Sequence, residues 1–297
     1  MSIKPFIIPT DPVREATIKQ RMADYEWPIE MQLGADENPW AYGMDQRWLK
    51  DFCRFVIEDY KWQATVDELN RFDHFTAEID GLNIHFIREV GSGDNPKPLL
   101  ISHGWPGSVY EFIDVIDRLA HPENYGGDAQ DGVTVICPSL PGYGFSDMPP
   151  RPIGQVTTAA LWDKLMVEVL GFKSYIAQGG DWGSVVTSLI GLNHSESKGG
   201  GCSAIHINMY GLRANAEPET EEENQWMADA QAVIQAESAY LQLQVTKPQT
   251  LIYAMQESPV GAAAWILEKF YSWSDIPENN GRPDINKRYS PHALASN

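Results

Sequence analysis

From about Leu99 onward, short apolar runs alternate with amphipathic stretches along the chain. The runs have the length of strands and the stretches the spacing of helices. We expect strands near 99–102, 133–137, 174–178 and 204–209, with helices near 107–120, 156–170 and 183–193 between them. Strands that alternate with helices predict an α/β fold: a mostly parallel sheet with helices on both faces and ligands bound at the carboxyl edge of its strands.

Before this region the pattern is helical up to about His74, most clearly over residues 45–60, where apolar and aromatic residues recur on one face. Residues 75–79 and 84–90 then read as two strands around the dipeptide Asp80-Gly81. Such a dipeptide between strand patterns is a strong hairpin signal. We therefore expect an antiparallel hairpin where the helical segment meets the sheet.

The last part of the chain again has helical patterns. Residues 217–223 are acidic and contain a proline, which is typical of a solvated connector or of the first turn of a helix. Ser258-Pro259 predicts the capped start of a helix over 260–271, because proline is favoured at the first helical position. The chain thus divides into three predicted parts: residues 1–74, 75–211 and 212–297.

Composition limits the class of protein. With 297 residues and 43% hydrophobic content the chain can bury a sizeable core, and its net charge of −19 argues against binding nucleic acid or anionic membranes. No apolar run approaches the ~20 residues of a membrane span, and no signal peptide is evident. The three cysteines, Cys53, Cys137 and Cys202, are odd in number and their spacing fits no known motif, so we expect them to be reduced core residues. We expect a cytoplasmic protein without a membrane anchor or a bound metal.

The sequence Gly-Gly-Asp-Trp-Gly at 179–183 falls where a predicted strand turns into a helix. It has the G-x-nucleophile-x-G spacing of a nucleophile elbow, in which small neighbours allow a sharp turn that raises one side chain. Here that side chain is Asp181. An ionised carboxylate needs no base, so it can attack an electrophilic saturated carbon directly and form an alkyl ester. The alternative is that Asp181 only caps the helix.

A second motif, His-Gly-Trp-Pro-Gly-Ser at 103–108, joins the predicted strand at 99–102 to a helix. In α/β-hydrolases this loop donates one backbone N–H to the oxyanion hole, and the residue after the nucleophile donates the other. The predicted donors are the N–H groups of Trp105 and Trp182. His103 and Gly104 are expected to support the loop, and Pro106 to form a rigid turn, cis or trans, or simply a loop.

Together with Pro-Ser-Leu-Pro-Gly-Tyr-Gly-Phe-Ser at 138–146, these two motifs resemble those of the microsomal-type epoxide hydrolases. The resemblance covers nearly the whole chain. Trp27-Pro28 and residues 40–62 resemble the N-terminal meander of that family, and residues from 237 onward resemble its cap. The resemblance implies an α/β-hydrolase fold with an N-terminal helical meander (1–74), an α/β-hydrolase core (75–211) and a helical cap (212–297).

In the mechanism that the resemblance implies, Asp181 attacks an oxirane carbon while Tyr240, one of two cap tyrosines, protonates the epoxide oxygen. A histidine-activated water then hydrolyses the ester, and a vicinal diol leaves. The implied partners are a small lipophilic epoxide and water, without a cofactor. Packing in an apolar gap is the alternative role for Tyr240.

Two other functions stay open. A haloalkane dehalogenase uses the same aspartate, often beside a tryptophan that binds halide, and Trp182 fits that reading. Tyr240 and the loop at 105–108 favour the epoxide, because a halide leaving group needs no proton. The third reading is a non-catalytic truncated product.

The resemblance also places a second tyrosine, an acid and the water-activating histidine in later core segments, for which this chain has no matching positions. His206 and His292 are not expected to replace that histidine. We therefore expect a chain truncated at its C-terminus, lacking the last core strands and helix and unable to turn over epoxides. We also expect the strand at 204–209 to be an exposed edge, so that the chain is marginally stable and dimerises there or binds the missing part in trans.

Overall fold

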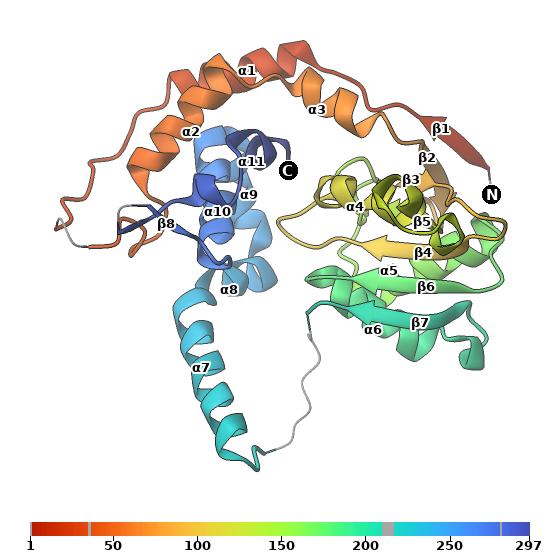
Figure 1. Cartoon of the computed structure of the whole chain (residues 1–297). Helices are drawn as coiled ribbons and strands as arrows, with labels where there is room; N and C mark the ends of the chain where they lie inside the picture. The colour runs from red at the N-terminus through yellow and green to blue at the C-terminus, as the bar shows by residue number, and fades with distance from the viewer. Residues whose placement is uncertain (1, 35–36, 210–216, 280) are drawn as a thin grey trace. The chain divides into compact units, whose positions relative to one another are not determined.

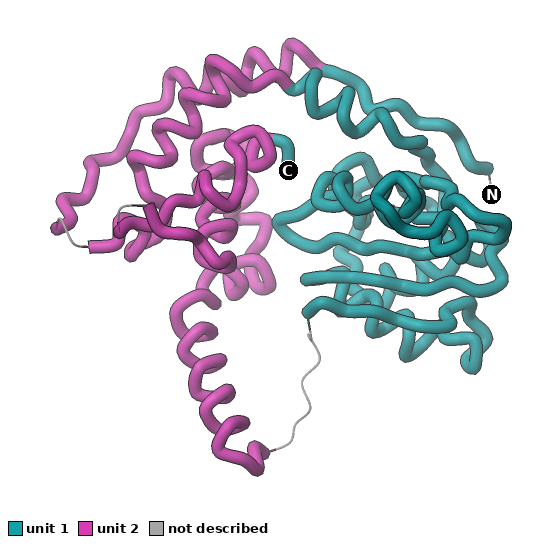
Figure 2. The backbone as a smooth tube through the Cα atoms, in the orientation of Figure 1, with its two compact units in different colours: residues 1–10, 62–213, 296–297 teal, residues 11–61, 214–295 magenta. Residues whose placement is uncertain are grey.

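The computed structural model describes residues 2–34, 37–209, 217–279 and 281–297, which form two compact units (Figure 2). Unit 1 comprises residues 1–10, 62–213 and 296–297, and unit 2 comprises residues 11–61 and 214–295. The predicted boundary between core and cap, at residues 211 and 212, lies outside the described residues. The three-part division into meander, core and cap stays a prediction.

Within the described residues, unit 1 contains a seven-stranded sheet ordered β1-β2-β3-β5-β4-β6-β7 (Figure 1). The strands are β1 (Ile3–Phe6), β2 (His74–Ile79), β3 (Leu82–Glu89), β4 (Lys97–Ser102), β5 (Val133–Pro138), β6 (Tyr175–Gly179) and β7 (Cys202–Ile207). β4 pairs in parallel with β5 and β6, and β6 with β7. β1, β2, β3 and β5 pair antiparallel in that order. The strand and helix alternation therefore predicted the parallel part of the sheet correctly.

Strand β1 is the strand that the pattern did not predict. It has four residues, one of them Pro5, and it pairs only with β2, about seventy residues later in the chain. A proline is tolerated there because β1 is an edge strand with one partner. The hairpin of β2 and β3 was predicted correctly. Its turn residues Asp80 and Gly81 have φ of 51° and 82°, as a type I′ turn requires.

Helices cover both faces of the sheet in unit 1 (Figure 1). One layer holds α5 (Gln155–Lys164), η4 (a π-helix, Leu165–Val169) and α6 (Trp182–Asn193), and the other holds α3 (Trp62–Leu69), η1 (Val109–Phe112) and α4 (Ile113–Ala120). Short 3₁₀ turns complete the unit: η2 (Pro122–Tyr125), η3 (Ala129–Asp131) and η5 (Glu196–Lys198). Successive strand residues point to opposite layers: Leu100 packs in the first core and Ile101 in the second. Both faces are thus apolar, as in buried parallel sheets.

A buried histidine pair crosses the antiparallel part of unit 1. His74 Nδ1 lies 2.9 Å from His85 Nε2, and His85 Nδ1 lies 2.9 Å from Ser139 Oγ. The other ring nitrogen of His74 bonds to the carbonyl of Leu69 at 2.8 Å. Burial, reinforced by the neighbouring histidines, lowers the pKa of His85 to about 3, and burial also lowers the pKa of His74. The pair therefore stays neutral and fixes the loop that follows β5.

Unit 2 is mainly helical. It contains α1 (Pro12–Ala23), α2 (Gln46–Glu58), α7 (Glu221–Glu237), α8 (Ala239–Thr246), α9 (Pro248–Glu257), α10 (Pro259–Ser272), η6 (Ile285–Lys287), α11 (Pro291–Ser296, whose last residue belongs to unit 1) and the small hairpin of β8 (Glu278–Asn279) and β9 (Arg282–Pro283). The early and late helical segments pack together, since Trp40 stacks on Tyr271 at 4.3 Å and Trp48 Nε1 donates to Asn286 Oδ1 at 3.2 Å. The single-face pattern at 45–60 correctly predicted α2.

The helix starts in unit 2 follow their sequence signals. Ser258 Oγ accepts the Gly261 N–H at 2.9 Å, and Pro259 opens α10. The acidic connector ends in a capping box, in which Thr220 and Glu223 satisfy each other's backbone N–H groups. The predicted capped start of α10 is therefore confirmed, and α7 begins inside the acidic segment.

The three cysteines are buried and form no disulfide, as predicted. Burial raises the pKa of the Cys53 thiol to about 11, so this thiol stays protonated. In the part of the chain that the structure describes, no helix is long and apolar enough to span a membrane.

Candidate active site

Asp181 lies at the junction of β6 and α6, in a backbone conformation that side-chain-bearing residues rarely adopt. Its φ is 49° and its ψ −127°. A non-glycine residue in such a conformation costs roughly 1–3 kcal/mol, and such residues cluster at functional sites. The side chain does not cap α6. Asp181 is the N-cap residue of α6 without a capping hydrogen bond, and its role as the nucleophile stays a prediction.

The glycines on either side explain how the elbow forms. A Cβ on Gly183 would lie 2.0 Å from the carbonyl oxygen of Ser102, at the end of β4. A Cβ on Gly179 would lie 2.1 Å from the carbonyl oxygen of Gly183. Only hydrogen fits at either position, so the start of α6 can approach the end of β4 closely. This approach brings Asp181 beside the loop at 103–108.

The loop meets Asp181 through a backbone donor. The Trp105 N–H donates to Asp181 Oδ1 at 2.8 Å. Gly104 leaves the room for this contact, because a Cβ there would lie 2.2 Å from the same oxygen. Burial raises the pKa of Asp181 above its ordinary value, and hydrogen bonds from the Trp105 and Trp182 N–H groups oppose that rise. The structure thus brings both predicted oxyanion donors to the predicted nucleophile.

His103 holds the loop from behind. Its Nε2 accepts the Leu140 N–H at 3.0 Å, so its Nδ1 carries the proton and donates to the carbonyl of Gly104 at 3.0 Å. Burial lowers the pKa of His103 to about 4, although its backbone bonds partly counter this. The imidazole is neutral and fully engaged by backbone. The Trp105–Pro106 peptide bond is cis.

Two titratable groups beside Asp181 were missed from the sequence. Glu111 lies in η1; desolvation, followed by the charge of Asp181, raises its pKa to about 7. Tyr143 lies in the loop after β5 with its ring 5.5 Å from that of His103; desolvation and then the charge of Asp181 raise its pKa to about 12. The signal for Glu111 was the spacing Ser108-x-x-Glu, and Tyr143 belongs to the motif at 138–146.

Comparison with known proteins places this arrangement in a family. The family model described as epoxide hydrolase N terminus matches residues 3–112, and the one described as alpha/beta hydrolase fold matches residues 97–198. The crystal structure of juvenile hormone epoxide hydrolase from the silkworm Bombyx mori is 30% identical and superposes with a TM-score of 0.86 over 99% of this chain and 72% of that chain. The chain belongs to the epoxide hydrolase family.

Other relatives agree. A putative epoxide hydrolase of Stigmatella aurantiaca is 38% identical and aligns with 95% of this chain, and epoxide hydrolase 1 of Oryctolagus cuniculus is 35% identical and aligns with 92%. The chain spans 62% and 63% of the length of these two relatives. The Aspergillus niger epoxide hydrolase structure, 28% identical, gives a TM-score of 0.82 over 100% of this chain and 76% of that chain. The fold is therefore the α/β-hydrolase fold, as the motifs implied.

Tyr240, the proton donor implied for an epoxide hydrolase, lies in α8 of unit 2, whereas Asp181 belongs to unit 1. Its ring is 5.0 Å from that of Trp273 and 6.5 Å, edge-on, from that of Trp265. Lys269 Nζ lies 5.0 Å from the centre of the same ring. Lys269 is itself buried and bonded to Glu237 at 2.9 Å. Tyr240 is therefore a half-buried side chain held by rings and a cation, and its catalytic role stays a prediction.

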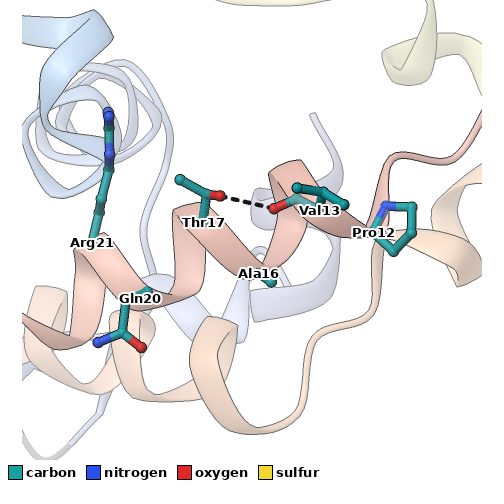
Figure 3. Close-up of a pocket in the computed structure, with 6 residues that line it drawn as sticks. All are labelled: Pro12, Val13, Ala16, Thr17, Gln20 and Arg21. Atoms are coloured by element: carbon teal, nitrogen blue, oxygen red, sulfur yellow. Dashed lines mark hydrogen bonds between the residues drawn. The ribbon is translucent and has the colours of Figure 1, made fainter.

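Other features of the described residues do not form a second site. A shallow groove follows α1 (Figure 3). Its lining comes from that single helix, and all six residues are exposed: Pro12, Val13, Ala16, Thr17, Gln20 and Arg21. Its one internal bond runs from the Thr17 hydroxyl to the Val13 carbonyl. Within the described ranges, no three His, Cys, Asp or Glu side chains gather as metal ligands do.

Proposed function

We propose that this chain opens epoxides through Asp181, which forms an alkyl ester; in the mechanism that the resemblance implies, a histidine-activated water converts this ester to a vicinal diol. The observation that carries this proposal is the 2.8 Å hydrogen bond from the Trp105 N–H to Asp181 Oδ1, at the tip of a strained elbow. The Trp105 N–H holds Oδ1, so the other carboxylate oxygen, Oδ2, is the proposed attacking atom. An ionised carboxylate needs no general base for this step.

The same donors suit both steps of the reaction. When Oδ2 bonds to an oxirane carbon, the C–O bond of the ring breaks and Oδ1 becomes the carbonyl oxygen of the ester. When water attacks this ester carbonyl and gives a proton to the histidine that the resemblance implies, negative charge develops on Oδ1, where the Trp105 and Trp182 N–H groups stabilise it. Collapse of that intermediate breaks the ester C–O bond, and the proton passes to the leaving alkoxide, which releases the diol and restores the carboxylate. An oxyanion hole thus serves hydrolysis while it positions the nucleophile.

The epoxide oxygen needs a proton as its ring bond breaks, and Tyr240 is the proposed donor. Its ring contacts with Trp265 and Trp273 and the nearby Lys269 restrict its rotation, which favours a fixed direction for its hydroxyl group. A positioned acid of this kind contributes typically 10²- to 10⁴-fold to rate. The proposed substrate is a small lipophilic epoxide, because these neighbours are aromatic and the relatives' names specify epoxides.

The test compares two substrates in water enriched in heavy oxygen. Styrene oxide should form a hydroxyalkyl ester on Asp181, and hydrolysis of this ester should carry the heavy isotope into the Asp181 carboxylate, because water attacks the ester carbonyl. Asp181→Asn should leave only the spontaneous reaction. A chloroalkane should release no chloride; release of chloride with no action on styrene oxide would assign a dehalogenase instead.

A further inference from the structure

Lys269 in α10 is the one lysine, arginine, aspartate or glutamate that is buried among the residues that the structure describes. Lysine is almost never buried unless its charge is paired. Here Nζ lies 2.9 Å from Glu237 Oε2 and 2.6 Å from Glu268 Oε2. Burial opposes the charged form, but the hydrogen bonds to Glu268 and Glu237 outweigh it and raise the pKa of Lys269. The ammonium group is therefore charged at neutral pH.

Two aromatic rings face the same ammonium group. Nζ lies 5.0 Å from the centre of the Tyr240 ring and 5.6 Å from that of the Trp273 ring. Both distances are within the roughly 6 Å over which a cation and a ring attract each other. An ammonium group has three N–H donors. Glu237 and Glu268 take two of them, which leaves the third for the rings.

The charge lies where three helices meet. Glu237 is the last residue of α7, Tyr240 is in α8 and Lys269 is in α10. A carboxylate at the end of a helix is unfavourable by itself, because the helix dipole is negative there. Apolar side chains would join the helices at least as well as a buried ion pair. The packing of these helices therefore does not explain why a lysine stands at 269.

We propose that Lys269 is a positioning residue that acts through Tyr240: its ammonium group, held at the ring by two carboxylates, stabilises the phenolate that forms when Tyr240 protonates the epoxide oxygen. This inference rests on the proposed function, since it takes Tyr240 as the proton donor. A phenolate spreads negative charge into its ring. A cation over that ring therefore attracts the phenolate more strongly than the phenol, and loss of the proton becomes easier.

The balance of charge in the proposed reaction requires such a cation. Asp181 loses its negative charge when its oxygen bonds to the epoxide carbon. The electron pair of the broken C–O ring bond takes the hydroxyl proton of Tyr240, which becomes a phenolate. Hydrolysis of the ester later regenerates an acid at Asp181, and the proton that this acid loses restores the Tyr240 hydroxyl group. One negative charge thus moves from Asp181 to Tyr240, and Lys269 lies at the end that gains it.

The acidity of Tyr240 can be measured without any substrate. Fluorotyrosine, with one fluorine on its ring, replaces tyrosine at position 240, and its fluorine NMR signal follows ionisation of the hydroxyl group. The charged groups that the described residues bring to this ring are Lys269, Glu237 and Glu268. Lys269→Met should move the midpoint of the titration up by about one pH unit, because the cation is lost. Glu237→Gln should move it down, because Lys269 remains with one carboxylate fewer.

Lys247→Met, exposed at the end of α8, is the matched control and should leave the midpoint unchanged. Equal midpoints in Lys269→Met and Lys247→Met would overturn the proposal. A shift in the same direction in Lys269→Met and Glu237→Gln would also overturn it, because general loosening of the helices has no sign of charge. If Lys269→Met does not fold, the direction of the shift in Glu237→Gln decides.

The rate of ester formation is the second measurement. Lys269→Met should slow the labelling of Asp181 by styrene oxide roughly tenfold, the effect of losing a cation–π contact shielded from water. The same substitution in the Tyr240→Phe background should change the rate little, because no hydroxyl proton remains to be released. An equal loss of rate in both backgrounds would show that Lys269 does not act through Tyr240.

The two measurements separate this inference from the proposed function. If the midpoints shift as expected but Asp181 is never labelled, Lys269 sets the acidity of Tyr240 and the proposed function fails. If Asp181 is labelled at the same rate in Lys269→Met and Lys247→Met, the proposed function holds and this inference fails.

Discussion

The proposed nucleophile and the proposed proton donor are held by different kinds of interaction. Around Asp181 in unit 1 the contacts are backbone groups: the Trp105 N–H at 2.8 Å and glycines that leave no room for a Cβ. Around Tyr240 in unit 2 they are side chains, namely tryptophan rings and the buried Lys269. A site built from backbone depends on a few small residues in fixed order, whereas one built from side chains depends on packing between distant helices.

The largest expected effect of a substitution on the rate of labelling is at Tyr240. If ring contacts fix the direction of its hydroxyl group, Tyr240→Phe should keep those contacts and lower the rate of labelling by styrene oxide by roughly 10²-fold or more, because only the proton is lost. Stopped-flow or quenched labelling measures this rate. Tyr253→Phe, an exposed tyrosine on α9, is the control. Equal rates in both variants would remove Tyr240 from the mechanism.

At the site around Asp181, which is built from backbone groups, one added methyl group should be enough to lower the rate of labelling. Gly104→Ala places a Cβ 2.2 Å from Asp181 Oδ1, so the carboxylate or the loop must shift, and a shift of about 1 Å can cost roughly 10²-fold in rate. Gly154→Ala is the matched control, because a Cβ there meets nothing within 4 Å. Labelling of Gly104→Ala at the wild-type rate would show that the loop does not position Asp181.

The buried histidines of unit 1 predict a pH-dependent stability. In the unfolded chain each imidazole ring binds a proton below pH ~6.5. In the folded chain burial lowers the pKa of His103 to about 4 and that of His85 to about 3. The unfolded chain thus binds more protons as pH falls from 6.5, and the free energy of unfolding should drop by roughly 3 kcal/mol for His103 alone by pH 4. Urea titrations at several pH values measure this.

The control for that prediction is an exchange of the buried ring. His103→Gln should lessen the dependence on pH, although it also lowers stability by removing two backbone contacts. His292→Gln, in α11 of unit 2, should leave the dependence as it is. An identical dependence in His103→Gln and wild type would mean that His103 binds a proton equally in both states.

A smaller effect is expected at the side-chain-built site. Lys269→Met keeps the bulk of the side chain but leaves the partly buried Glu237 and Glu268 without their cation. This should lower the free energy of unfolding by roughly 2 kcal/mol. Lys247→Met, exposed at the end of α8, is the control and should change stability little. Equal stability of the two variants would show that the cluster contributes nothing net.

The same contrast between local backbone patterns and distant side-chain packing explains which features the sequence predicted. The glycine spacing at 179–183 predicted a strand-to-helix elbow, and the elbow exists with the expected residue raised. The motif at 103–108 likewise predicted the loop that meets Asp181 through the Trp105 N–H. Both are local patterns whose geometry is set by a few consecutive residues. Alternation of apolar residues similarly predicted β4, β5, β6 and β7 to within two residues.

What the sequence did not predict depends on contacts between distant segments. Strand β1 is defined only by pairing with β2, and Glu111 reaches the loop at 103–108 only because its carboxyl group packs against Gly107. Lys269 reaches the ring of Tyr240 from another helix, twenty-nine positions later in the chain. No pattern in a single segment carries these pairings, since each is decided by how the elements pack.

The most direct test of the account is to locate the covalent bond. The wild-type chain is incubated with styrene oxide, quenched in acid before hydrolysis, digested and mapped by mass spectrometry, with Asp181→Asn treated in parallel. The account predicts one adduct per chain, on Asp181, and none in the variant. An adduct on Glu111 or on any other residue, or labelling that survives in Asp181→Asn, would contradict the central claim that the elbow carboxylate is the nucleophile.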